Sequence, residues 1–85
     1  MKYVRQIFAE GQPVLDWYDD NDFEHDAAIG DMVRITDMNF SLPGMSLTGM
    51  ITEIREKSVA ISSQGRLIWF QYDRITDIQT VTKSV

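Results

Sequence analysis

The sequence LTGMITEI, residues 47–54, indicates how this chain folds. Its apolar residues first alternate with polar ones, as in a strand with one buried face. The pattern then shifts by one position, because Ile54 is apolar and Glu53 is not, and such a shift is typical of a β-bulge or a sharp bend. Gly49 is the residue at which a strongly coiled strand bends most easily. We therefore expect a bent strand that lets a small sheet close on itself.

Four further segments around this stretch carry short β patterns separated by turn-forming residues. They are residues 32–36, 59–61, 66–72 and 75–78, with one longer loop over residues 37–46. About five strands with short connections predict an all-β fold, and the length permits only a small antiparallel barrel, residues 29–85. Residues 80–85 are expected to fray.

The N-terminal residues 1–28 are predicted to form an acidic extension that packs on the barrel. Residues 2–9 fit either a helical face or a strand. Pro13 suits the first position of a short helix whose apolar stripe is Val14, Leu15, Trp17 and Tyr18. Residues 19–26 read as an exposed acidic loop, with a helical turn around residues 23–27.

Length and composition limit the class of protein. Eighty-five residues form one domain with one small core. The chain has no cysteine, which excludes disulfides and thiolate metal sites. The first ten residues lack the apolar stretch of a signal peptide, and no run is long enough to span a membrane. We expect a cytoplasmic protein.

The net charge of −5 is unevenly distributed. Residues 32–85 are close to neutral. The first 31 residues hold two bases, Lys2 and Arg5, against eight acids, which are Glu10, Asp16, Asp19, Asp20, Asp22, Glu24, Asp26 and Asp31. Non-specific binding to nucleic acid depends on neutralising phosphates, so the charge of the whole chain opposes it.

The order of the expected strands resembles that of SH3-like and Sm-like small barrels. Gly30 and Asp31 before residues 32–35, followed by residues 47–54, also resemble the KOW motif of ribosomal and transcription-elongation proteins. That resemblance implies a nucleic-acid-binding barrel. The loop over residues 37–46 departs from the motif, because it is longer and carries none of the basic residues that KOW loops use on RNA.

A second resemblance covers about 35 residues of the C-terminal half. Residues 47–54, 59–61, 68–70 and 75–78 are similar to the YolD-like family and to the Rho inhibitor Rof. These are small bacterial and phage proteins, and Rof acts on a transcription terminator by protein contact. The resemblance implies a bacterial or phage regulatory protein.

The acidic cluster has three interpretations. Asp20, Asp22 and Glu24 alternate as in a calcium loop and Asp31 lies at the twelfth position, but His25 stands where the turn needs glycine. The cluster can otherwise bind a basic partner or imitate nucleic acid, or it is a solvated loop. We expect no bound metal and no cofactor. For His25, flanked by two acids, we expect an exposed loop position.

Two tryptophans are the main candidates for recognition. If Ile68 and Phe70 face the core, then Leu67 and Trp69 face outward and suit a protein contact or base stacking. The alternative is that the N-terminal segment, with Trp17, covers Trp69. The candidate partner-binding residues are Trp69, Leu67, Trp17, Asp19, Asp20 and Asp22.

The sequence thus predicts a non-enzymatic binding or regulatory module that acts through protein contact, since no nucleophile and base stand together. One alternative is a nucleic-acid-binding barrel that uses five residues, Arg34, Arg55, Lys57, Arg66 and Trp69. A second is an acidic mimic of nucleic acid. The sequence leaves the oligomeric state open.

Overall fold

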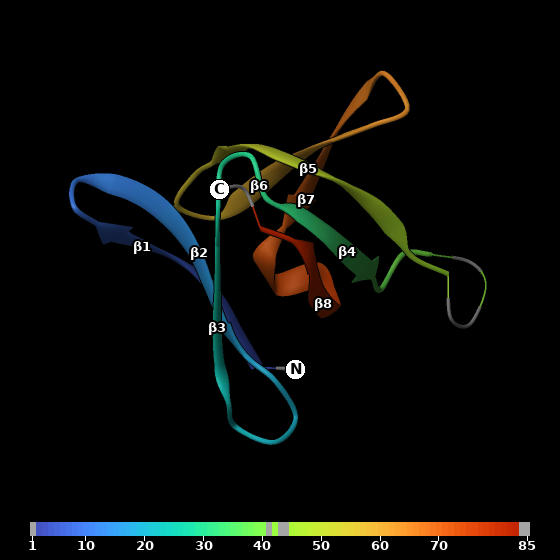
Figure 1. The fold of residues 1–85 in the computed structure, drawn as a ribbon. Helices are drawn as coiled ribbons and strands as arrows, with labels where there is room; N and C mark the ends of the chain where they lie inside the picture. The colour runs from blue at the N-terminus through green and yellow to red at the C-terminus, as the bar shows by residue number, and fades with distance from the viewer. Residues whose placement is uncertain (1, 41, 43–44, 84–85) are drawn as a thin grey trace.

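Two antiparallel sheets packed against each other make up the fold (Figure 1). The computed structural model describes residues 2–40, 42 and 45–83. The first sheet contains β1 (Lys2–Ala9), β2 (Gln12–Tyr18) and β3 (Glu24–Ala28) in that order. The second sheet contains β4 (Met32–Asp37), β5 (Leu47–Ile54), β6 (Ser58–Ser63), β7 (Arg66–Gln71) and β8 (Ile75–Thr82). A 3₁₀ helix, η1 (Tyr72–Arg74), separates β7 from β8.

The sequence predicts a short helix from Pro13 to Tyr18, and this prediction is wrong. These residues belong to β2, which pairs with both β1 and β3. Leu15 and Trp17 alternate with Asp16, so a strand places both apolar side chains on one face, toward the core. The helical turn expected around residues 23–27 is also replaced by strand β3.

Two hairpins use the same kind of turn. Glu10 and Gly11 connect β1 to β2 with φ values of 54° and 78°, and Gln64 and Gly65 connect β6 to β7 with 52° and 76°. Two consecutive residues with positive φ match the right-handed twist of the flanking strands, and glycine at the second position adopts this conformation without steric cost.

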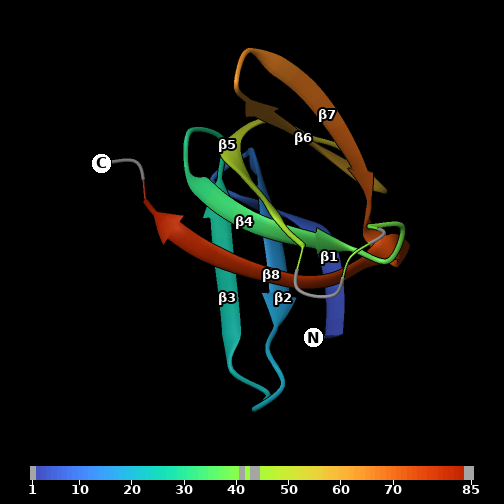
Figure 2. The same ribbon diagram turned by 90° about the vertical axis from the view of Figure 1, so that its right-hand side faces the viewer.

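The second sheet has the order β7-β6-β5-β4-β8 (Figure 2). Its five strands coincide with the five segments expected from the sequence, but the described residues form eight strands in all, because the first sheet adds three that the sequence analysis did not predict. The predicted closure into a barrel is wrong, because among the described strands β7 and β8 each have one hydrogen-bonded neighbour and do not pair with each other. The first sheet, rather than barrel closure, covers the apolar face of the second.

The bend predicted within residues 47–54 is confirmed. The register of β5 against β6 shifts between Ile51, opposite Ile61, and Glu53, opposite Ala60. One extra residue on β5 returns Ile54 to the face that Ile51 occupies, and both side chains are buried.

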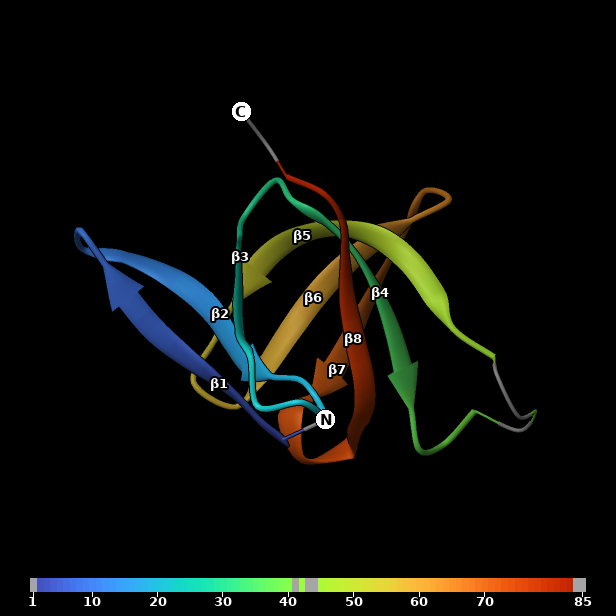
Figure 3. The same cartoon turned by 60° about the horizontal axis from the view of Figure 1, so that its bottom comes forward.

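The two sheets face each other in Figure 3, and the core side chains lie between them. The core contains Leu15, Trp17 and Ala27 from the first sheet and Val33, Ile35, Ile51, Ile54, Val59, Ile61, Phe70, Ile75 and Ile78 from the second. The fraying expected from residue 80 is wrong up to Thr82, because β8 continues to that residue and pairs it with Met32.

Candidate interaction surface

An apolar surface lies on the outward face of the five-stranded sheet. In one cross-strand row, Met32 stands opposite Met50, Met50 opposite Ser62, and Ser62 opposite Leu67. Residues directly opposite each other in an antiparallel pair project from the same face. Trp69 stands in the next row, opposite Ala60. Ala60 itself is buried. We call the remaining set, Met32, Met50, Leu67 and Trp69, the Trp69 surface.

Three large side chains of the Trp69 surface are exposed to solvent. The exposed fractions are 58% for Leu67, 41% for Trp69 and 42% for Met50. Leu67 and Trp69 lie two positions apart on β7, and Met50 of β5 stands in the same cross-strand row as Leu67, with Ser62 of β6 between them. They therefore share one region of the outward face rather than being scattered over the surface. Tryptophan contributes large contact area to interfaces, and methionine adapts its shape to a partner.

The indole ring of Trp69 is held by a neighbouring ion pair. The guanidinium carbon of Arg55 lies 4.4 Å from the ring centroid, and Arg55 Nε lies 2.8 Å from Glu53 Oε2. The cation stacks on the electron-rich face of the ring while the carboxylate neutralises its charge. Trp69 is thus preorganised, and Arg55 brings little free positive charge to the surface.

Tyr72 fixes the turn from which Arg55 projects. Its hydroxyl donates a hydrogen bond to the carbonyl oxygen of Arg55 at 2.5 Å, and its backbone N–H donates to the carbonyl of Lys57 at 3.0 Å. Burial raises the pKa of Tyr72 to about 12, so the hydroxyl remains a donor at neutral pH.

The acidic loop between β2 and β3 is organised around Asp19. One carboxylate oxygen accepts hydrogen bonds from the N–H groups of Asn21 at 2.8 Å and Phe23 at 3.1 Å. The other lies 2.8 Å from Nε2 of His25, whose ring stacks on Trp17 with centroids 5.7 Å apart. The hydrogen bond to His25 lowers the pKa of Asp19 below its ordinary value. The loop position expected for His25 is wrong, because this residue lies on β3, opposite Trp17, and its side chain supports the acidic loop through Asp19.

One buried acid of the first sheet, Asp16, is paired with a basic residue. Asp16 is 1% exposed, and Arg5 Nε donates to its carboxylate at 2.9 Å. This hydrogen bond raises the pKa of Arg5. Asp16 also raises the pKa of Glu24, first through a side-chain hydrogen bond and then through charge repulsion. The acidity predicted for this region is therefore partly compensated.

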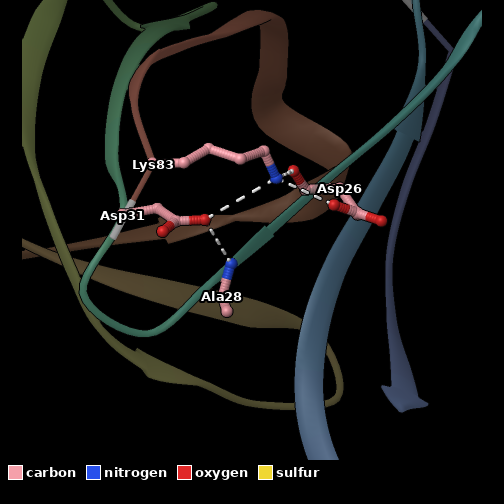
Figure 4. A network of polar contacts seen from close by, with 4 residues as sticks. All are labelled: Asp26, Ala28, Asp31 and Lys83. Atoms are coloured by element: carbon pink, nitrogen blue, oxygen red, sulfur yellow. Dashed lines mark hydrogen bonds and ion pairs between the residues drawn. The ribbon is translucent and has the colours of Figure 1, made fainter. Parts of the chain in front are cut away.

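Lys83 connects the two sheets (Figure 4). Its Nζ lies 2.7 Å from the carbonyl oxygen of Asp26, 2.9 Å from Oδ1 of Asp26 and 3.8 Å from Oδ2 of Asp31. The same oxygen of Asp31 accepts the N–H of Ala28 at 2.9 Å. Asp31, placed by the sequence at the end of a calcium pattern, thus holds the β3–β4 turn. Within the described ranges, no three carboxylates or histidines are gathered as a metal site.

The candidate residues predicted from the sequence fall into three places. Leu67 and Trp69 lie together on the outward face. Trp17 is 1% exposed and lies in the core, so it neither covers Trp69 nor reaches a partner. The loop with Asp19, Asp20 and Asp22 shares a cleft with β8, at the opposite edge of the second sheet from β7.

The sequence analysis missed two features of the Trp69 surface. Met50 precedes Ile51 and alternation alone assigns it to the outward face, so its exposure was readable from the pattern. The stacking of Arg55 on Trp69 depends on the pairing of β6 with β7 and has no local signal.

The basic residues of the nucleic-acid alternative are spread over the sheet. Arg34 lies on β4 and donates to Gln79 at 3.4 Å, and Arg55 is paired with Glu53. Arg66 opens β7, whereas Lys57 lies in the turn beyond the other end of that strand.

No protein-family model, curated protein or solved structure matches this chain. In the described part of the chain, no helix has the length and apolar character needed to cross a membrane.

Proposed function

We propose that this protein is a non-enzymatic protein-binding module and that the Trp69 surface is its contact surface. The observation that carries the proposal is that exposed Leu67 and Trp69 of β7 share the outward face with exposed Met50 of β5, which stands in the same cross-strand row as Leu67. A patch of this composition is typical of protein interfaces, with tryptophan as the anchor.

The charges around the Trp69 surface favour a protein partner over nucleic acid. The chain carries a net charge of −5, and the cation nearest to Trp69 is already paired with Glu53. Binding to a phosphate backbone gains most of its free energy from unpaired cations that displace counterions. An apolar patch on a partner protein needs no such cations, so a protein partner fits the Trp69 surface better than nucleic acid does.

The experiment is affinity capture from the native host, comparing the wild type with Trp69→Ala and Leu67→Ala. Phe23→Ala is the matched control, because it removes an exposed aromatic ring from the acidic loop at the opposite edge. We expect a specific protein to bind the wild type and the control, and its recovery to fall at least tenfold for the two surface variants, equivalent to about 1.4 kcal/mol.

A gel-shift assay with DNA and RNA tests the alternative on the same proteins. Salt-sensitive binding to either nucleic acid, lost in the Trp69 variant and accompanied by no captured protein, would replace the proposal with the nucleic-acid-binding function.

A further inference from the structure

The β7 edge of the second sheet carries a sequence that proteins seldom leave exposed. β7 reads RLIWFQ and has one charged residue, Arg66, at its first position. Segments of this length with high β propensity and low charge pair readily with other strands, and native edges are normally interrupted by charges, proline or bulges. Among the described strands β7 pairs with β6 alone, and its outer side is open (Figure 2).

The other sheet edges have such interruptions. β3 begins with three charged or titratable residues, 24–26. β1 contains Arg5, and its register against β2 shifts around Tyr3, which has a φ of 59°. β8 carries Asp77 and a register shift at each end of its pairing with β4. Compared with these edges, β7 has the fewest features that oppose pairing with another strand.

We propose that a second copy of this chain pairs with β7 in antiparallel orientation about a two-fold axis. A two-fold axis uses the same edge on both copies and closes the assembly at two. Like-with-like pairing is electrostatically permitted, because the one charge of β7 lies at its end, away from the centre of the contact. The inference goes beyond the proposed function, which requires a single copy.

Side-chain alternation determines the register of this pairing. Odd-numbered residues of β7 face outward and even-numbered residues face the core. Opposed residues must share a face, because a one-residue slip reverses every side chain. With Trp69 on the axis, each Trp69 meets its copy, Ile68 meets Phe70, and Arg66 lies outside the paired residues. With Ile68 on the axis, Arg66 would meet Phe70 on the core side. The first register is therefore the favoured one.

The pairing has two physical consequences. Ile68, which is half-buried at the sheet edge, becomes covered on its open side. The two five-stranded sheets become one continuous sheet, and the two Trp69 surfaces meet on its outward face. A partner with two matching sites then binds both copies at once.

The oligomeric state is measured by sedimentation velocity over a wide concentration range. We expect a dimer, and we expect Ile68→Lys to weaken it about a hundredfold, tenfold for each of the two lysines placed beside the contact. The matched control is Thr80→Lys, a half-exposed core-side position on β8 at the opposite edge. Circular dichroism of both variants establishes that they fold.

The register is tested by introduced cysteines, since the chain has none. Leu67→Cys, Trp69→Cys and Gln71→Cys are each oxidised under mild conditions. Directly opposed residues lie about 5 Å apart and form disulfides. Copies of residue 67 or 71 would stand about 13 Å apart in the favoured register, at about 3.3 Å per residue. We expect a cross-linked dimer for Trp69→Cys alone.

A monomer at millimolar concentration overturns the inference, and so does a dimer that Thr80→Lys disrupts and Ile68→Lys does not. Cross-linking at residue 67 or 71 instead of 69 refutes the register. A monomeric protein that still captures its partner through Trp69 would refute the dimer and leave the proposed function standing.

Discussion

Replacement of Gly49 by alanine tests the reasoning about the bent strand most directly. A Cβ at this position would lie 2.5 Å from the carbonyl oxygen of Ser62 and would also collide with Cγ2 of Ile61. The carbonyl belongs to the backbone of the neighbouring strand, so the clash can be relieved only by moving β5 away from β6. Overpacking of this kind costs about 1–3 kcal/mol, and a backbone obstacle places Gly49 toward the upper half of that range.

A loss of about 2–3 kcal/mol lowers the melting temperature of a domain this size by about 10–20 °C. The assay is thermal unfolding followed by circular dichroism. Gly11→Ala is the comparison, because no atom lies within 4 Å of its added Cβ and only the φ of 78° opposes alanine, at about 1 kcal/mol. A melting temperature for Gly49→Ala within about 4 °C of the wild type would refute the close approach of the two strands.

Three further outcomes follow from the packing and the pKa shifts. Trp17→Ala should lose about 3–5 kcal/mol in urea unfolding, because the side chain is fully buried, whereas Trp69→Ala should lose far less. The pKa of Glu24 is raised in the folded state, so the folded protein binds this proton more tightly than the unfolded chain does. The resulting stabilisation is complete below the unfolded pKa of about 4.5 and is lost as pH rises through the folded pKa. Glu24→Gln should therefore raise the melting temperature near neutral pH and leave it unchanged at about pH 3, and an equal effect at both would contradict the assignment. Tyr72→Phe should cost about 1 kcal/mol through the lost hydrogen bond to Arg55, and it should remove the tyrosinate absorbance that develops at about pH 12.

The second sheet was largely predictable because its strands carry local signals. The shift of apolar positions between Ile51 and Ile54 predicts the bulge, and the turn residues at 62–65 predict the hairpin that follows. The absence of barrel closure had no local signal, because it depends on how the first sheet covers the apolar face.

The first sheet was mispredicted because its apolar residues occur in adjacent pairs. Pairs such as Val14 and Leu15 fit one face of a short helix as well as they fit a strand. The polar Asp16 between Leu15 and Trp17 favours the strand, but its partner Arg5 lies on a different strand and is invisible to local periodicity. Glu10 and Gly11 were the available signal for a hairpin.

For the candidate surface, the sequence assigned Leu67 and Trp69 to the outward face from the alternation within β7. It could not separate the two tryptophans by burial, because that difference arises from the packing of the two sheets. It also missed the pairing of Lys83 with Asp26, which are 57 positions apart in the sequence.

The position of β4 in the second sheet constrains the order in which the chain can fold. One neighbour of β4 is β5, but the other is β8, and Thr36 and Thr76, which contact each other across that pairing, are separated by 40 positions. During synthesis, β4 through β7 can assemble as a meander before β8 is available. The backbone N–H and C=O groups on one side of β4 then remain unpaired. Contacts of this separation slow folding, because the entropy of loop closure is lost before the strands gain their contacts. Emergence of β8 from the ribosome is therefore the step that ends the exposure of β4 to pairing with other nascent chains.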